Sequence, residues 1–327
     1  MGAKQIRPGR ETAGNLRIAV LIPCHNEQLA IATVVHGFCA VLPEAAIYVY
    51  DNNSDDGTAE AARAAGAIVR SEPRQGKGHV VRRMFADIEA DIYVLVDGDA
   101  TYDAASAPSL ISDLIGNHRD MVIATRIDRD ATAYRRGRRT GNRVLTGFMT
   151  AVFRRSFADT LSGYRAFSRR FVKSFSGLSA GFEIETELTV HALVLGLPVG
   201  EIQTPYYARP DGSQSKLKTW RDGFRIVWMM FRLYRTERPL VFFSGLGILF
   251  AALSISFAIP VFATYLHEGL VPRLPTAVLS TGLMVIAFLS VLAGLILDNI
   301  TRARRELKLL AYLEQPAIDS RYRANTD

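Results

Sequence analysis

Two aspartates separated by a single glycine follow an apolar run in the first third of the chain. The stretch reads Val-Leu-Val-Asp-Gly-Asp over residues 94–99, which places carboxylates at Asp97 and Asp99. Carboxylate oxygens are the donors that Mg²⁺ and Mn²⁺ prefer, and water or phosphate oxygens usually complete the shell of such an ion. The same pair is also common in an ordinary solvated turn, so the surrounding elements must decide between the two interpretations.

The elements around this pair follow an α/β pattern. Short β-branched runs alternate with helical patterns over the first two hundred residues, which predicts a mainly parallel sheet flanked by helices. In such sheets, ligands bind beyond the carboxyl ends of the strands. Strands are expected at residues 17–24, 47–53, 67–70, 91–97 and 120–126, and helices near 27–41, 58–65, 77–90 and 104–117.

Polar side chains stand at the ends of four of these strands, at residues 23–27, 51–57 and 97–99 and at Arg126. Carboxylates accept paired hydrogen bonds, so Glu27 and Asp51 are candidates for contacts with the base and ribose of a nucleotide. As a set, the strand-end residues favour a ligand site over a solvated turn. The metal would then lie at the two aspartates.

Several basic residues could face anionic groups in such a site. The segment Gly76-Lys77-Gly78 is similar to a phosphate loop, but it lacks the Walker spacing and the Ser or Thr after the lysine, which argues against a P-loop NTPase. Arg126 ends a strand, and Arg209 and Lys216 lie in a Gly/Ser-rich segment that could close over a diphosphate. Each alone is typical of a solvated surface residue, but together they predict phosphates on both sides of a reaction.

The last third of the chain contains two uncharged apolar spans, residues 240–266 and 276–297. Both exceed the roughly 20 residues that cross a bilayer as a helix. Residues 216–238 hold seven Lys or Arg against two acids, a net charge of +5, and residues 301–310 hold four against one, a net charge of +3. The connector at 267–274 is neutral. By the positive-inside rule, the soluble domain and the C-terminus are expected in the cytoplasm, on a multi-pass anchor in the inner (plasma) membrane.

The basic excess of the chain, a formal net charge of +7, gathers at the ends of the apolar spans. Anionic lipid headgroups explain this distribution better than nucleic acid, which is not expected as a partner. Residues 219–237 place Trp228, Phe231 and Tyr234 on one face, with arginines flanking it. A helix on the membrane surface and an ordinary core helix both show this pattern, and its place directly before an apolar span favours the membrane surface.

The chain is therefore expected to divide into five segments. Its two cysteines, Cys24 and Cys39, are expected to be reduced, because a disulfide framework or a zinc site would need more partners. The first segment lacks the apolar region of a signal peptide. The segments are a polar lead-in at 1–15, a catalytic domain at 16–215, a juxtamembrane helix at 216–238, two transmembrane helices within 239–300 and a cytoplasmic tail at 301–327.

The motifs along residues 18–238, in their order and spacing, resemble those of the family 2 glycosyltransferases with the GT-A fold. Within that family they are most similar to the polyprenyl-phosphate glycosyltransferases, which include dolichyl-phosphate mannose synthase and its bacterial undecaprenyl-phosphate relatives. Two positions depart from the pattern: Thr101 stands where relatives often have Gln, and residues 51–58 read DNNSDDGT where many have DDGSTDGT. The motifs are Pro23…Asn26-Glu27, the Asp51 segment, Gly76-Lys77-Gly78, Asp97-Gly98-Asp99, Ser162-Gly-Tyr-Arg-Ala-Phe167, Gly181-Phe-Glu-Ile-Glu185 and Arg209…Gly212-Ser…Ser215-Lys216.

The resemblance implies an α/β fold with a GT-A-type mixed sheet flanked by helices, followed by an amphipathic interfacial helix and a two-helix transmembrane hairpin. It implies Mg²⁺ or Mn²⁺ at Asp97 and Asp99, and Arg126 and Arg139 on a lipid phosphate. The residues that would hold the nucleotide are Pro23, His25, Asn26, Glu27, Asp51, Asn53, Lys77, Asp97, Gly98, Arg209 and Lys216, the last two on a loop over the diphosphate.

The expected reaction is inverting transfer of a sugar from a nucleotide sugar, UDP being favoured over GDP, to a polyprenyl phosphate. A lipid monophosphate is already anionic near neutral pH, so it needs no strong general base, and Glu183 or Glu185 would position the sugar or the acceptor. The product would serve cell-envelope polysaccharide synthesis. The sequence leaves open whether the protein forms a homo-oligomer.

Two alternatives remain. A family 2 enzyme that glycosylates a lipid hydroxyl would need Glu185 as a base. A membrane-anchored nucleotide-sugar-binding protein would use the same site without catalysis.

Overall fold

The computed structural model describes residues 16–128, 147–148, 157, 159–179, 181, 183–209 and 219–318, with only the backbone described at residue 128 and over 219–227. The chain divides into two compact units, residues 1–219 together with 308–327, and residues 220–307. Arg139 and Lys216, both expected in the site, lie outside the described residues.

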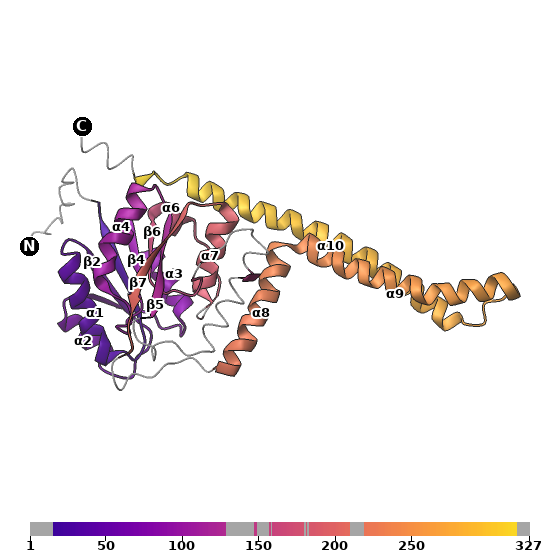
Figure 1. Ribbon diagram of the computed structural model, residues 1–327, viewed down its shortest axis with the longest axis horizontal. Helices are drawn as coiled ribbons and strands as arrows, with labels where there is room; N and C mark the ends of the chain where they lie inside the picture. The colour runs from indigo at the N-terminus through magenta and orange to yellow at the C-terminus, as the bar shows by residue number, and fades with distance from the viewer. Residues whose placement is uncertain are drawn as a thin grey trace, which may run out of the picture. The chain divides into compact units, whose positions relative to one another are not determined.

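Seven strands of the described part of the first unit form one sheet, in the order β3-β2-β1-β4-β6-β5-β7 (Figure 1). Strand β6 is antiparallel to its neighbours β4 and β5, and the other neighbouring strands are parallel. The expected mixed α/β sheet is therefore confirmed. The strands are β1 (Ile18–Cys24), β2 (Ala46–Asp51), β3 (Ile68–Ser71), β4 (Ile92–Leu95), β5 (Met121–Asp128), β6 (Arg165–Ser168) and β7 (Val199–Tyr206).

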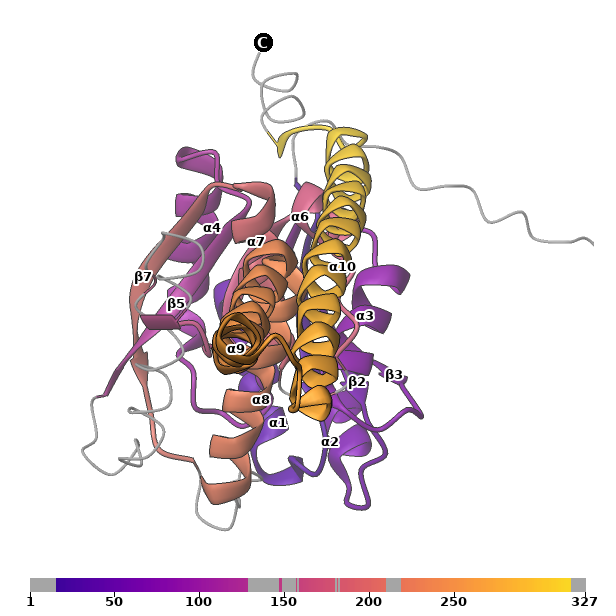
Figure 2. The same ribbon diagram turned by 90° about the vertical axis from the view of Figure 1, so that its right-hand side faces the viewer.

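Helices cover both faces of this sheet (Figures 1 and 2). Alternate residues of β1 point to opposite sides: Val20 and Ile22 belong to one core cluster, and Ala19 and Leu21 to the other. Because both faces are buried, the strands read as continuous apolar runs. One core includes residues of α1 (Gln28–Val41), α2 (Thr58–Ala64) and α4 (Ala107–Gly116), and the other includes residues of α3 (Lys77–Asp87), α6 (Arg169–Ser174) and α7 (Ile184–Leu195).

The end of the chain is part of the sheet unit. The Tyr312 hydroxyl donates to Asp120 Oδ2 at 2.9 Å, and the guanidinium of Arg170 lies 5.3 Å from the centre of the Tyr312 ring. Arg169 Nε donates to Gln315 Oε1 at 3.0 Å. Residues 308–318 thus pack against the ends of β5 and β6, although they fall in the segment expected to be a tail.

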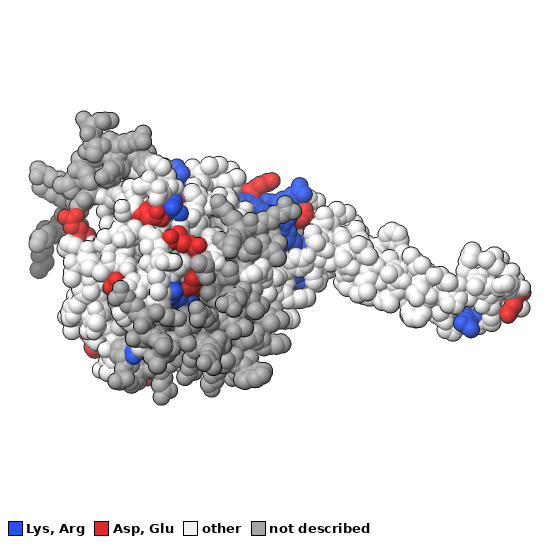
Figure 3. Space-filling model, in the orientation of Figure 1, with Lys and Arg blue, Asp and Glu red and all other residues white. Residues whose placement is uncertain are grey.

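The second unit contains α8 (Thr219–Glu237), α9 (Pro239–Glu268) and most of α10 (Leu274–Leu313). Helices α9 and α10 are long and apolar enough to cross a membrane, judged by length and composition. Their surface is largely uncharged, with charged side chains gathered at the ends of the hairpin (Figure 3). Trp228 and Phe231 of α8 are exposed, which fits a surface helix better than a core helix.

Small buried residues recur every seven positions where α9 and α10 pack together. A seven-residue repeat keeps one stripe of a helix facing its partner, and small residues let two helix backbones approach closely. Ser254 Oγ donates to the carbonyl of Ser280 at 2.6 Å across this contact. The buried residues at this contact are Gly247 and Ser254 on α9 and Ser280, Ala287 and Gly294 on α10, and Thr301, one repeat further on, donates to the Thr236 carbonyl of α8 at 3.2 Å.

Gly247→Leu is expected to destabilise the hairpin. A Cβ at Gly247 would lie 2.9 Å from Val291 Cγ2 and 3.0 Å from the Ala287 carbonyl oxygen, and overpacking a tight contact costs about 1–3 kcal/mol. Gly245→Leu is the matched control, because a Cβ there meets nothing within 4 Å. The measurement is the unfolding free energy of each variant in detergent micelles. Equal losses in the two variants would contradict the packing.

Candidate active site

The loops that follow β1 and β2 are joined by hydrogen bonds near the candidate nucleotide residues. Asn26 accepts from the backbone N–H of Asp55 at 2.8 Å, and its own N–H donates to Ser54 Oγ at 2.9 Å. Its φ of 50° is a left-handed conformation that asparagine tolerates better than most residues. The N–H of Glu27 donates to Thr58 Oγ1 at 2.9 Å. Asn26 and Glu27 are therefore held beside the loop that begins at Asp51.

Asp51 is the last residue of β2, and one oxygen of its carboxylate is available to a ligand. Its Oδ2 accepts a hydrogen bond from the N–H of Ser54 at 3.3 Å. Its Oδ1 is buried and has no hydrogen-bond partner among the described residues. A buried acceptor without a partner is uncommon in folded proteins, and it marks a place where a ligand donor could bind.

Asn52 and Asn53 connect this loop to the start of α3. The Asn52 side-chain amide donates to the carbonyls of Glu72 and Arg74, both at 2.8 Å, and its Oδ1 accepts from the N–H of Gly76 at 2.7 Å. Asn53 Nδ2 donates to the Pro73 carbonyl at 2.7 Å. Asn52 therefore fixes the loop that precedes Lys77, a role that sequence reasoning left unassigned because its partners lie 20 to 24 residues away.

The ammonium of Lys77 lies between two carboxylates at the end of the sheet. It donates to Asp97 Oδ1 at 2.5 Å and also to Glu185 Oε1. The side chains of Lys77 and Glu185 are 9% and 6% exposed, whereas that of Asp97 is 29% exposed. Asp97 is thus the most exposed member of the group.

These neighbours change the acidity of the group. Burial raises the pKa of Glu185, and the positive charge of Lys77 opposes this effect. Burial alone would lower the pKa of Lys77, but the attraction of Asp97 and Glu185 outweighs it and raises that pKa. Lys77 is therefore a permanent cation shared by two carboxylates.

Asp99 is held by a second cation and by a hydroxyl. Its Oδ2 lies 2.5 Å from Nη2 of Arg209, whose Nη1 is 3.8 Å from Glu27 Oε1. Its Oδ1 accepts from the hydroxyl of Thr101 at 2.6 Å and from the Thr101 N–H at 3.2 Å. Thr101 therefore orients Asp99, whereas the sequence showed it only as a departure from the Gln that relatives often have at this position.

Two glycines allow the chain to pass close to this group. A Cβ at Gly98 would lie 2.5 Å from Cys24 Sγ. A Cβ at Gly163 would lie 2.8 Å from Cγ of Asp97, and closer still to its Oδ2. A side chain at either position would displace the Cys24 or the Asp97 side chain, so glycine leaves room for both.

The donor set fits a divalent cation. Asp97 and Asp99 supply hard carboxylate oxygens, and in this structure each carboxylate is paired with a cation of the chain, Lys77 or Arg209. Among the described residues, no three His, Cys, Asp or Glu side chains gather as a metal cluster. An ion held by two carboxylates leaves positions for water and phosphate oxygens, which is how Mg²⁺ is commonly bound beside a diphosphate.

The remaining candidates are placed as follows. Arg126 pairs with Asp159 through Nε at 2.6 Å and Nη2 at 2.8 Å, so this expected phosphate ligand has a carboxylate partner that the sequence did not indicate. Pro23 pairs with Tyr50 in the sheet, and His25 is partly buried just beyond β1. Their roles towards a ligand, like those of the other candidates, stay predictions.

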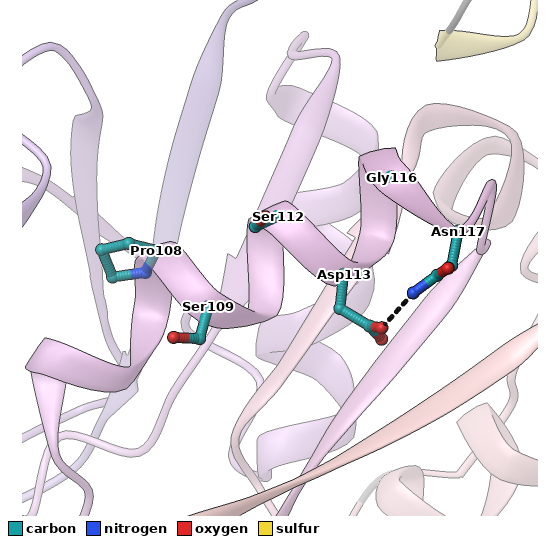
Figure 4. A pocket seen from close by; sticks show the side chains of 6 residues that line it. All are labelled: Pro108, Ser109, Ser112, Asp113, Gly116 and Asn117. Atoms are coloured by element: carbon teal, nitrogen blue, oxygen red, sulfur yellow. Dashed lines mark hydrogen bonds between the residues drawn. The ribbon is translucent and has the colours of Figure 1, made fainter.

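An open depression on α4 lies apart from these residues (Figure 4). Asn117 Nδ2 donates there to Asp113 Oδ1 at 2.7 Å. None of the strand-end candidates lines it, and it contributes nothing to the chemistry described above. Its lining residues are Pro108, Ser109, Ser112, Asp113, Gly116 and Asn117.

Comparison with known proteins identifies the class. Residues 19–175 match the family model for glycosyl transferase family 2. The glycosyltransferase AglJ of Haloferax volcanii is 33% identical over 307 residues, covering 91% of this chain and 98% of that protein. The chain therefore belongs to glycosyltransferase family 2 and is a glycosyltransferase.

The chain is also similar to a second named relative and to a solved structure. A dolichyl-phosphate hexose transferase of Haloferax volcanii is 28% identical over 226 residues, covering 68% of this chain and 95% of that protein. The crystal structure of glucosyl-3-phosphoglycerate synthase from Mycobacterium tuberculosis, with Mn²⁺, uridine diphosphate and glucosyl-3-phosphoglycerate, matches with a TM-score of 0.53 and 22% identity, covering 66% of this chain and 80% of that one. At this identity the likeness establishes the shared fold, and it confirms the expected GT-A type.

In the Lys77→Met variant, the free energy of unfolding is expected to fall as the pH rises. Without the ammonium, Glu185 is a buried carboxyl whose folded-state pKa lies above the ordinary 4.5, so folding favours the protonated form and stability is lost as the pH rises above that value. Breaking a buried ion pair costs about 3–5 kcal/mol, and this loss should be largest at alkaline pH. The measurement is the unfolding free energy by chemical denaturation across the pH range.

The double variant Lys77→Met/Glu185→Gln is the control, because it removes the charge left unpaired. It should recover much of the loss and flatten the pH dependence. A loss in Lys77→Met that is the same at every pH would show that Glu185 does not depend on this cation.

Proposed function

We propose that the protein transfers a sugar from a nucleotide sugar, with a divalent metal, to a polyprenyl phosphate, with inversion at the anomeric carbon. The observation that carries the proposal is the strand-end group itself. Asp97 and Asp99 follow one buried strand, each is paired with a cation from another element, and Asp51 offers a buried acceptor nearby along the sheet edge. Such a group suits a diphosphate that arrives with its own metal.

The donor side of the proposal uses four residues. Asp51 and Glu27 accept hydrogen bonds from the nucleoside, and Lys77 and Arg209 are the cations that the diphosphate would meet. Mg²⁺ or Mn²⁺ at Asp97 and Asp99 would supply charge stabilisation to the departing diphosphate. Fixed cations add to this stabilisation because they need no reorganisation as negative charge develops.

The acceptor side rests on two observations. Helices α9 and α10 are apolar enough to span a bilayer, and a relative is named a dolichyl-phosphate hexose transferase. A lipid monophosphate is anionic before it attacks, so the reaction proceeds without a strong base. Arg126, 9% exposed and held by Asp159, would need to share its guanidinium with that phosphate, and Arg139 would be its second ligand.

The location proposed follows from the same helices. The basic flanks at residues 216–238 and 301–310 support, by the positive-inside rule, a topology with both ends of the hairpin on the cytoplasmic side of the plasma membrane. The exposed Trp228 and Phe231 of α8 would lie at the membrane surface, where aromatic side chains are favoured. The sheet unit would then meet the lipid phosphate at the headgroup level.

The purified protein is expected to form a lipid-linked monosaccharide. The assay contains undecaprenyl phosphate, Mn²⁺ or Mg²⁺, and a panel of UDP- and GDP-sugars. The product should disappear with EDTA, and Asp99→Asn should lower the rate on the order of 100-fold, as loss of one charge-stabilising group commonly does. Asp113→Asn, in the depression on α4, is the matched control and should leave the rate unchanged. Mass spectrometry of the lipid fraction is the measurement.

Other outcomes of this assay separate the alternatives. Transfer to diacylglycerol or ceramide, with none to a polyprenyl phosphate, would replace the proposal with a lipid-hydroxyl glycosyltransferase. Nucleotide-sugar binding without transfer to any acceptor would favour a non-catalytic binding protein.

A further inference from the structure

Arg165 is a fully buried cation in the first unit, and the function proposed above gives it no role. Among the described residues, its nitrogen–oxygen hydrogen bonds go to neutral acceptors. Nε donates to the carbonyl of Ser162 at 2.9 Å, Nη2 to the carbonyl of Thr160 at 2.7 Å, and Nη1 to Thr189 Oγ1 at 2.9 Å. Burial lowers the pKa of Arg165 to about 10. A buried charge is costly, so filling space does not explain an arginine here.

The first two bonds fix the turn that lies against Asp97. Strands β4 and β6 are antiparallel with Leu95 opposite Arg165, so the same register places Gly163 beside Asp97. Space for a side chain at Gly163 is taken by the Asp97 carboxylate. The N–H of Gly163 also donates to the Tyr102 hydroxyl at 2.9 Å. Arg165 and Tyr102 therefore hold this turn from two sides, and the turn limits where Asp97 can lie.

The third bond reaches the helix that carries Glu185. Thr189 Oγ1 accepts from Arg165 and donates to the carbonyl of Glu185 at 3.0 Å, one helical turn earlier on α7. The guanidinium thus joins the turn beside Asp97 to the first turn of α7. Asp97 and Glu185 are also the two carboxylates that share the ammonium of Lys77.

We propose that Arg165 is a positioning residue that fixes the separation of Asp97 and Glu185, and with it the place of Lys77 between them. The proposal deepens the proposed function, because it rests on Asp97 as a metal ligand and Lys77 as a ligand of the diphosphate. It makes no use of the acceptor. The loops that carry Asp51 and Glu27 are joined by bonds of their own at Asn26 and Thr58, so they do not depend on this arginine.

The predicted effect falls on the part of the site that would hold the metal and the diphosphate. Loosening the link lets Asp97 and Glu185 move relative to each other, which weakens the metal site but leaves the nucleoside contacts in place. A displacement of about 1 Å in a catalytic group can lower a rate on the order of 100-fold. A purely structural role would instead lower thermal stability and leave metal and nucleotide binding of the folded protein unchanged.

The sharpest variant is Thr189→Val, which keeps the side-chain shape and removes the hydroxyl. Thr189→Ser is its matched control, because serine keeps both the acceptor for Arg165 and the donor to Glu185. Arg165→Lys tests the guanidinium itself, since lysine keeps the charge but cannot bond three acceptors in a fixed plane. Thr189→Val keeps the test decisive if the arginine variant fails to fold.

Electron paramagnetic resonance of free Mn²⁺ measures metal binding by the full-length protein, in the presence of UDP or GDP. Thr189→Val and Arg165→Lys are expected to weaken Mn²⁺ binding about tenfold, a partial form of the misplacement effect, whereas the affinity for uridine or guanosine, which lack the diphosphate, should be unchanged. Thr189→Ser should match the wild type. Measurements are made below the melting temperature of every variant.

Wild-type Mn²⁺ affinity in folded Thr189→Val would overturn the proposal, and so would parallel losses of metal and nucleoside binding. Failure of the wild type to bind Mn²⁺ with either nucleotide would remove the site that Arg165 is proposed to position. Because no acceptor is used, transfer to a different lipid would refute the proposed acceptor and leave this result standing.

Discussion

The ammonium of Lys77, shared by Asp97 and Glu185, is the interaction on which the rest of the site depends. It joins the start of α3, the end of β4 and the first turn of α7, three segments that are distant in sequence. Two buried or half-buried carboxylates could not approach one another without a cation between them. The other features of the site serve this arrangement: Asn52 holds the loop before Lys77, and Gly163 leaves room for Asp97.

The sheet brings these segments together through β6, the one reversed strand among those described. Strand β6 lies between β4 and β5 and runs antiparallel to both, so the turn before it arrives beside the carboxyl end of β4. A parallel strand in that place would present its opposite end to Asp97. The reversed strand therefore supplies Gly163 and Arg165 to a site whose other parts come from parallel strands and the helices that follow them.

The sequence predicted the α/β class, most strands and the two apolar helices, because alternating apolar runs and uncharged spans are local signals. It also placed Asp97 and Asp99 at a strand end, since their spacing can be read directly. It did not indicate β6, a fully buried strand of four residues that is too short to show a period. Nor could it indicate Asp159 as the partner of Arg126 or Asn52 as the support of Gly76, because those contacts join residues 33 and 24 positions apart. The bond from Thr101 to Asp99 spans only two residues, and an Asp-x-Thr pattern could have indicated it.

The central claim is that Asp97 and Asp99 hold a divalent metal beside a nucleoside diphosphate. Anomalous diffraction at the manganese edge, from crystals grown with Mn²⁺ and the nucleoside diphosphate that the protein binds, tests it most directly. The account predicts an anomalous peak in contact with carboxylate oxygens of both aspartates and with a phosphate oxygen. A peak elsewhere, or nucleotide bound at the sheet edge with no metal at either aspartate, would contradict it.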